Sequence, residues 1–128
     1  MIDESAIGKG ATRDWLVDEA LTVRAHGTVD LPVLATPNLI FMLEDTCVAA
    51  AKPLLDDGEL TVGTAVYVDH LAAAPVGTQI HANVRIVAIR PKRLVFRVEA
   101  TAGPSVVARG VHERAIVKKL ELERRLQK

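Results

Sequence analysis

The sequence predicts an α+β fold in which one antiparallel β-sheet packs over a single long helix. Three observations carry this prediction. Residues 37–54 form an apolar segment with helix-start and helix-stop signals, residues 62–118 alternate apolar and other residues over several long strands, and the turns between those strands are short. Strands joined by short turns pair antiparallel, because a parallel pair needs a crossover of about a dozen residues. The economical packing lays one face of that sheet over the helix, and its exposed edges favour dimerisation.

Length and composition are those of an ordinary globular domain. The 128 residues are 49% apolar and 25% charged, with no formal net charge, so nucleic acid is not expected as the main partner. No apolar run approaches the roughly 20 residues that span a bilayer, and the acidic start is not a signal peptide. A lone cysteine, Cys47, excludes an internal disulfide and favours a reducing compartment. We expect one domain over residues 1–128, in the cytoplasm and without a membrane partner.

The elements follow in order along the chain. A first strand is predicted within residues 13–24, broken near residues 18–19, and a loop over residues 25–33. The helix is predicted at residues 37–54, because Thr36 suits the N-cap and Pro37 the first helical position. The Asp-Asp-Gly sequence at residues 56–58 ends it. Further strands are predicted at residues 62–70, 80–88, 94–100 and 106–118, followed by a charged helical tail that runs to Lys128.

Glu44 is out of place in this helix. The segment is apolar on nearly every side through Ala51, which predicts that the rest of the fold encloses it. Glu44 shares a row with Ile40 and Val48, four residues to either side. A carboxylate in such surroundings is paired, protonated or functional.

Thr36 and His70 are the residues that would give Glu44 a chemical role. Thr36 precedes Glu44 by eight residues, so both side chains face one side of the helix, and the helix N-terminus favours a developing oxyanion. His70 is out of place on a strand face made mostly of valine, namely Val62, Thr64, Val66, Val68 and His70. If strand and helix pack together, a hydroxyl, a carboxylate and an imidazole converge. Such a group suits acyl transfer, with water or Thr36 as nucleophile and Glu44 or His70 as general base.

Each of these residues also has a purely structural interpretation. Thr36 can serve only as an N-cap, and His70 can be a hydrogen-bonded core histidine. Glu44 can form a structural ion pair with a core histidine or with an arginine such as Arg114. Cys47, three residues past Glu44, is predicted to be inert core packing.

Three segments resemble the fluoroacetyl-CoA thioesterase-like branch of the hot-dog fold. They are Ala-Thr at residues 35–36 with Glu44, Gly-Thr-Ala-Val-Tyr-Val-Asp-His at residues 63–70, and Gly-Val-His-Glu-Arg-Ala at residues 110–115. The similarity runs from about Asp14 to Val117. It implies a sheet wrapped around a central helix, and a homodimer or higher oligomer with a continuous double-length sheet. It also implies a thioester site at the dimer interface, with no metal and no cofactor beyond the coenzyme A of an acyl-CoA substrate.

The resemblance also implies roles for individual residues. It matches three positions to catalytic residues: Thr36, Glu44 and His70. It matches Gly63 and Arg114 to a supporting glycine and arginine, and we place Asn38, in the first helical turn, with them in substrate binding. In this interpretation Glu44 attacks the thioester carbonyl or activates water, and His70 handles the proton of the leaving thiolate or of water. The resemblance does not choose between the two roles of Glu44.

The loop before the helix departs from the fluoroacetate-specific members of that branch. Those members carry phenylalanines in a longer loop that forms a lid over the acyl group, whereas residues 26–34 contain no aromatic residue. Pro37 after the threonine also reshapes the expected acyl pocket. We therefore expect another small acyl group, carried by coenzyme A or by an acyl carrier protein. For the phosphates of coenzyme A, the candidates are the basic turn at residues 90–93 and the basic tail at residues 118–125.

Two other functions remain open at this point. One is a protein that binds acyl-CoA or another small ligand without turnover. The other is a hydratase or dehydratase with the same fold, which typically uses an Asp–His pair. The neighbour of His70 is Asp69, which would point to the opposite face of its strand.

Overall fold

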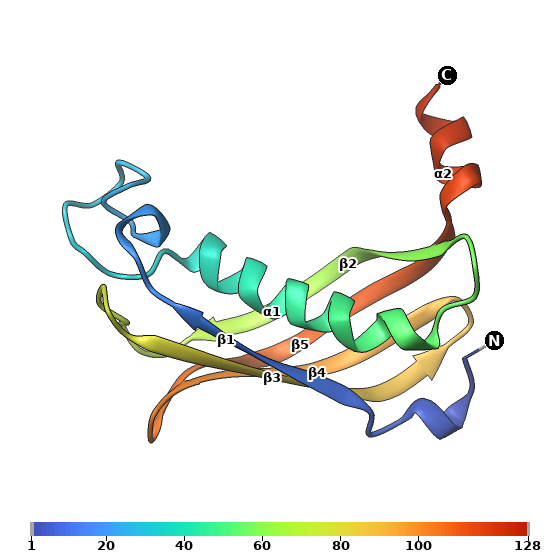
Figure 1. Ribbon diagram of the computed structural model, residues 1–128, viewed down its shortest axis with the longest axis horizontal. Helices are drawn as coiled ribbons and strands as arrows, with labels where there is room; N and C mark the ends of the chain where they lie inside the picture. The colour runs from blue at the N-terminus through green and yellow to red at the C-terminus, as the bar shows by residue number, and fades with distance from the viewer. Residues whose placement is uncertain (1, 128) are drawn as a thin grey trace.

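The computed structural model describes residues 2–127 and shows a five-stranded antiparallel sheet with one long helix across one face (Figure 1). The strands are β1 (Gly10–Leu16), β2 (Glu59–His70), β3 (Gln79–Arg90), β4 (Arg93–Ala102) and β5 (Ser105–Lys118). Their order in the sheet is β1-β3-β4-β5-β2, and every pairing is antiparallel. The helices are α1 (Thr36–Ala51) and α2 (Lys119–Leu126), with short 3-10 turns η1 (Glu4–Ala6), η2 (Glu19–Leu21) and η3 (Lys52–Leu54). The predicted fold class is confirmed.

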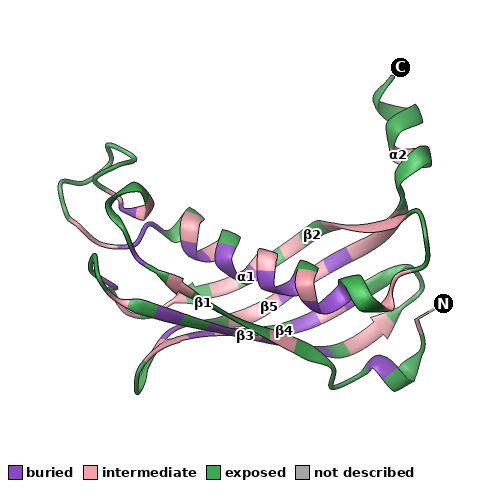
Figure 2. Cartoon of the chain, viewed as in Figure 1, coloured by how far each residue is buried: buried purple, intermediate pink, exposed green. Residues whose placement is uncertain are grey.

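The core lies between α1 and the middle of the sheet. Along β3 and β4 every second residue is buried, as a strand with one covered face requires: Ile80, Ala82, Val84 and Ile86, then Leu94, Phe96, Val98 and Ala100. The helix contributes Leu39, Met42, Leu43, Thr46, Cys47, Ala50 and Ala51. Figure 2 shows these buried positions on the side of α1 that faces the sheet. None of the helices within residues 2–127 is long and apolar enough to cross a membrane.

The start of α1 differs from the prediction at one residue. Ala35, in an extended conformation, occupies the N-cap, and no side chain caps the helix. Thr36 is therefore the first helical residue and Pro37 the second, a position at which the missing N–H costs nothing. The N-cap role expected of Thr36 is wrong, and its hydroxyl is available to bond elsewhere.

The rest of the structure does not enclose α1 as expected. Phe41 is 56% exposed and Val48 is 40% exposed, because a single helix on a single sheet has no layer over its other side. The helix also ends at Ala51, slightly before the predicted end, and η3 follows it. One whole face of α1 is thus open in this chain.

The first strand is displaced from its predicted position. β1 spans Gly10–Leu16 instead of the expected residues 13–24, and η2 replaces the second half of that range. Gly10 permits the early start, because a Cβ there would lie 1.9 Å from the Val84 carbonyl oxygen of β3. The four later strands were predicted to within about three residues at each end. The charged tail forms α2, which projects away from the sheet (Figure 1), while Lys128 lies outside the described residues.

Candidate active site

Thr36 and His70 meet where α1 begins and β2 ends. The Thr36 Oγ1 atom lies 2.8 Å from Nδ1 of His70. The other ring nitrogen, Nε2, is buried and has no hydrogen-bond partner among the described residues. Buried nitrogens are nearly always bonded, so Nε2 of His70 is left with an unused bonding capacity within residues 2–127, as is Nε1 of Trp15.

Glu44 lies further along α1, in contact with a buried arginine. Its Oε2 atom is 3.3 Å from Nη1 of Arg114, whose side chain is 7% exposed, whereas the Glu44 side chain is 38% exposed. Two further N–H groups of Arg114 are bonded to β2: Nε donates to Thr61 Oγ1 at 2.9 Å, and Nη2 donates to the Thr61 carbonyl oxygen at 3.0 Å. The guanidinium is therefore held in one orientation, with one edge directed at a carboxylate that solvent still reaches.

A bulge in β2 brings the surroundings of Glu44 and His70 to the same face. Gly63 pairs with Arg114 and Val66 pairs with His112, and the register shifts between Gly63 and Ala65. Paired residues of antiparallel strands point to the same face, and His112 and Arg114 share one face because they are two residues apart. Gly63 thus shares the helix-facing side with His70. The strict alternation predicted for this strand, with Thr64 on the face of His70 and Gly63 opposite, is wrong because it contains no extra residue.

Gly63 leaves the space that this cluster needs. A Cβ at Gly63 would lie 3.0 Å from Oε2 of Glu44, 3.2 Å from Cε1 of His112 and 3.3 Å from Nη1 of Arg114. These distances are tighter than ordinary carbon contacts. A glycine here therefore lets these protein side chains approach without displacement, while its expected approach to substrate stays a prediction.

His112 is a member of the site that sequence reasoning did not single out. It is 2% exposed, and its Nδ1 lies 2.8 Å from the Ala65 carbonyl oxygen. Its Nε2 lies 3.0 Å from Nη1 of Arg114 and 3.8 Å from Oε2 of Glu44. Burial lowers the pKa of His112, the hydrogen bond to Ala65 opposes that effect, and the charge of Arg114 lowers the pKa further. Its position two residues before Arg114 on one strand was the available signal.

Cys47 does not take part in the chemistry. It is fully buried, and burial raises the pKa of its thiol to about 12. A thiol without access to solvent or to its thiolate form is inert, as expected from its place on the apolar side of the helix.

The structure joins two of the three predicted catalytic residues directly and keeps the third apart. Within residues 2–127, the polar contacts of Glu44 are with Arg114 and His112, and none is with Thr36 or His70. Eight helical residues separate Glu44 from Thr36, a rise of about 12 Å. Asn38, predicted to bind substrate, has its Oδ1 2.6 Å from Nε2 of His26 in the preceding loop.

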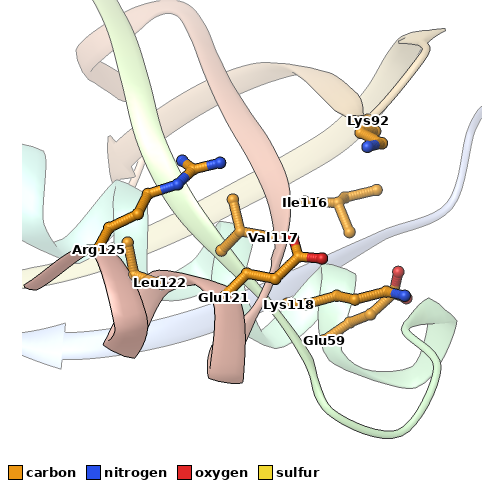
Figure 3. A pocket seen from close by; sticks show the side chains of 8 residues that line it. All are labelled: Glu59, Lys92, Ile116, Val117, Lys118, Glu121, Leu122 and Arg125. Carbon is orange, nitrogen blue, oxygen red and sulfur yellow. The ribbon is translucent and has the colours of Figure 1, made fainter.

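The two basic segments expected to meet phosphate do converge. Lys92, in the turn between β3 and β4, and Arg125, on α2, line one pocket (Figure 3). Its apolar wall is formed by Ile116, Val117 and Leu122, and the remaining lining residues are Glu59, Lys118 and Glu121. Arg93 is committed elsewhere, because its Nη1 donates to Thr64 Oγ1 at 2.9 Å. In the part of the chain that the structure describes, no group of three His, Cys, Asp or Glu side chains is arranged to hold a metal ion.

Comparison with known proteins agrees with this architecture. The family model described as fluoroacetyl-CoA-specific thioesterase matches residues 17–120. Fluoroacetyl-CoA thioesterase from Streptantibioticus cattleyicolor is 34% identical over 124 residues, which cover 91% of this chain and 88% of that protein. A solved mutant of a fluoroacetyl-CoA-specific thioesterase, in complex with fluoroacetate and CoA, matches with a TM-score of 0.84 and 32% identity over 91% of this chain and 98% of that one.

The fold itself is shared more widely. A hot-dog-like protein from Thermanaerovibrio acidaminovorans matches with a TM-score of 0.88 at 23% identity, over 94% of this chain and 90% of that one. That match concerns the sheet and the central helix alone. The chain therefore belongs to the fluoroacetyl-CoA-specific thioesterase family, a family of thioester hydrolases with the hot-dog fold.

Proposed function

We propose that this protein hydrolyses a small acyl-CoA thioester to the free acid and coenzyme A, using side chains alone. The observation that carries the proposal is the bonded pair of Thr36 and His70 at the start of α1, on the helix that also presents Glu44 against Arg114. A hydroxyl and an imidazole at a helix N-terminus, with a carboxylate further along, supply what acyl transfer to water requires.

We assign the first steps to the pair at the helix start. With the ring proton on Nδ1, His70 donates to the Thr36 oxygen, and the Thr36 hydroxyl hydrogen is free to donate to the thioester carbonyl. The unpartnered Nε2 then receives a proton of the water that the reaction consumes, directly or by way of Glu44, and gives it to the leaving thiolate. The new carbon–oxygen bond forms first, to give a tetrahedral oxyanion, and the carbon–sulfur bond breaks as that oxyanion collapses.

Glu44 supplies the nucleophilic side of the reaction. It either attacks the thioester carbon, to give an anhydride that water cleaves, or removes a proton from the attacking water. Arg114 holds one carboxylate oxygen at 3.3 Å, so the other oxygen is presented toward solvent and substrate. Because Glu44 and Thr36 lie about 12 Å apart along the helix, the proposed site is completed by a second copy of the chain.

The proposed assembly is a homodimer through β2. This strand is twelve residues long and lies at the edge of the sheet, where its outer backbone groups have no strand partner among residues 2–127. Beside it, Val66 is 41% exposed and Tyr67 is 66% exposed, and the open face of α1 carries Phe41 and Val48. An unpaired edge of this length is a template for another strand. Pairing two copies of β2 about a two-fold axis would form one double-length sheet and cover both open helix faces. Sedimentation as a monomer at micromolar concentration would contradict it.

The acyl group we propose is small and is not fluoroacetyl. The segment before α1 has no aromatic side chain to close over the acyl group, and its Val29 and Leu31 are about half exposed. At the other end of the substrate, Lys92 and Arg125 are placed to meet the phosphates of coenzyme A, and the apolar wall of their pocket suits the adenine ring (Figure 3). This arrangement favours coenzyme A over an acyl carrier protein, and the lone buried cysteine is consistent with a cytoplasmic location.

The proposed function is tested by a panel of acyl-CoA thioesters, from acetyl to long-chain, branched and aromatic, with release of free thiol as the readout. We expect turnover of one or more short-chain members. Binding without release from any member would instead support a ligand-binding protein. Hydration of an enoyl-CoA would support the hydratase alternative. Against that alternative, Asp69 is exposed and lies opposite Arg109 of β5 in the strand register, on the other face of the sheet from His70.

A further inference from the structure

The guanidinium of Arg114 is hydrogen-bonded by Thr61 and by His112. Of these two residues, His112 contacts the nitrogen atom that also faces Glu44. On the β2 side, Nε and Nη2 of Arg114 donate to Thr61. Its remaining nitrogen, Nη1, lies between Nε2 of His112 at 3.0 Å and Oε2 of Glu44 at 3.3 Å. The guanidinium is planar, so its bonds to Thr61 set the direction of the Nη1 hydrogens, and the imidazole is the acceptor that keeps this end of the group from tilting away from Glu44.

The contacts of His112 allow a single arrangement of its ring protons. A guanidinium has donors and no acceptor, so Nε2 of His112 must accept from Arg114. The Ala65 carbonyl is only an acceptor, so Nδ1 must carry the proton and donate to it. Both contacts agree on the neutral ring with its proton on Nδ1, and the low exposure of 2% excludes water from competing for either nitrogen.

We propose that His112 is a positioning residue for the thioester hydrolysis: as a neutral imidazole it fixes Nη1 of Arg114, and through it the carboxylate of Glu44. The proposal rests on the proposed function, since it assigns a task within that same site. His112 is too buried to touch the substrate, so it acts through Arg114. The extra residue in β2 contributes as well, because it places the Ala65 carbonyl where Nδ1 can reach it.

A second proton on His112 would undo the arrangement. Nε2 would then carry a hydrogen directed at the Arg114 guanidinium, placing donor against donor and charge against charge. The charged groups around the ring are Arg114 beside it on β5, Glu44 on α1 and Glu113 next to it in the chain. Burial and Arg114 disfavour that proton, so the neutral ring is the working form at neutral pH.

Two variants of His112 separate its two hydrogen bonds. His112→Asn keeps a donor near the position of Nδ1 and removes the acceptor that faces Arg114. His112→Gln reaches the position of Nε2 and restores an acceptor, while it loses the bond to Ala65. We expect His112→Asn to lower kcat by about 10- to 100-fold with KM changed less than threefold, the scale of a small misplacement of a reacting group. His112→Gln should recover at least a third of the wild-type kcat. His81→Asn, on an exposed histidine that contacts Asp14 on the neighbouring strand, is the matched control and should keep wild-type kcat.

A double-mutant cycle with Arg114→Lys tests whether His112 acts through Arg114. Once the guanidinium is replaced, adding His112→Asn should lower kcat by less than threefold more, because the interaction is already gone. Multiplying effects of the two substitutions, or a kcat in His112→Gln no higher than in His112→Asn, would overturn the proposal.

The nitrogen NMR shifts of the His112 ring provide a readout that does not depend on turnover. We expect a neutral ring protonated on Nδ1 at pH 7, and a charged ring or a proton on Nε2 would overturn the proposal. If the wild-type protein released no thiol from any acyl-CoA, the proposed function would fail. The ring signals would then still decide whether His112 holds Arg114 as described.

Discussion

Oγ1 of Thr36 and Nδ1 of His70 lie 2.8 Å apart, although 34 residues separate them in the chain. The bond exists because Ala35 takes the N-cap and frees the Thr36 hydroxyl, and because β2 ends beside the start of α1. This hydrogen bond couples the helix start directly to the end of the edge strand. Its chemistry can be tested one atom at a time.

Replacing Thr36 by valine removes the hydroxyl and keeps the shape of the side chain, whereas replacing it by serine keeps the hydroxyl. Since His70 bonds the oxygen, we expect Thr36→Val to lower kcat/KM by about 100-fold or more and Thr36→Ser by less than tenfold. Initial rates of thiol release measure both. Similar losses in the two variants would show that the methyl group matters and the hydroxyl does not.

Glu44→Gln keeps the volume of the side chain and its contact with Arg114 while removing the nucleophile or base. We expect kcat to fall by about two to four orders of magnitude with the fold intact. Asp45→Asn is the matched control, because Asp45 is the next carboxylate on α1 and is paired with Arg13 instead of Arg114. Near-normal turnover in a folded Glu44→Gln protein would exclude the proposed mechanism.

Alanine substitutions at two glycines, Gly63 in β2 and Gly110 in β5, should have different effects on activity and stability. In Gly63→Ala the new Cβ would press on the ends of side chains, chiefly Oε2 of Glu44 at 3.0 Å, so we expect at least a tenfold loss of kcat with little loss of stability. In Gly110→Ala the Cβ would lie 2.0 Å from the Tyr67 carbonyl oxygen. We expect that variant to lose stability, because the backbone itself must move. Thermal unfolding and kcat measured together separate the two, and equal melting temperatures in both variants would contradict the argument.

The lowered pKa of His112 predicts a pH dependence of stability. The folded protein binds a proton at His112 less readily than the unfolded chain, whose histidine titrates near the ordinary value of 6.5. The contribution of His112 to the free energy of unfolding therefore has its full value above about pH 6.5. This contribution decreases as the pH falls through the lowered pKa of the folded state. The slope is at most about 1.4 kcal/mol per pH unit for one proton. Urea unfolding between pH 5 and 8 measures it, and His112→Asn should flatten that part of the curve. An unchanged slope in the variant would assign the effect to other groups.

The pocket between α2 and the turn before β4 predicts a difference in KM between acyl-CoA and acyl-pantetheine, which lacks the nucleotide part of coenzyme A. We expect the Lys92→Ala, Arg125→Ala double variant to raise KM for acyl-CoA by about tenfold and to leave KM for the matching acyl-pantetheine unchanged. Arg97→Ala, on the exposed face of β4, controls for lost positive charge. Added salt should weaken acyl-CoA binding in the wild type more than in the double variant. An equal rise in KM for both substrates would show that the pocket does not hold the phosphates.

The regular features of the molecule follow from the amino-acid pattern alone. The period of two places the inward residues of β4, and those of β3 as far as Ile86, correctly, whereas a bulge after Ile86 turns Ile89 inward in place of Ala88. The apolar segment with Pro37 locates α1. Features that depend on tertiary contacts do not follow from it. The first strand continues only as far as β3 supports it, and Thr36 does not cap the helix because Ala35 occupies the N-cap, which leaves the Thr36 hydroxyl to His70.

The site was accessible to sequence reasoning in part. Glu44 was identified because a carboxylate stood among apolar residues, and its predicted alternative partner, Arg114, is its partner in the structure. Its catalytic role stays a prediction, since an ion pair and a catalytic carboxylate share this geometry. His112 did not stand out in the same way, because its neighbours in the sequence are not uniformly apolar. Its hydrogen bonds to Ala65 and Arg114 become evident only when β2 lies beside β5.

The bulge in β2 also determines which genetic changes this strand can accept. Seven residues separate Gly63 from His70, an odd number, yet both face α1, and only the extra residue near Thr64 makes that possible. A deletion of Thr64 would remove the extra residue and leave the two on one face by plain alternation, whereas a one-residue insertion or deletion elsewhere between them, with the bulge kept, would turn one of the two out of the site. A one-residue change of length between Gly63 and His70 is therefore tolerated only where it removes the bulge itself, and lineages that diverge in substrate should vary their loops more than the length of this strand.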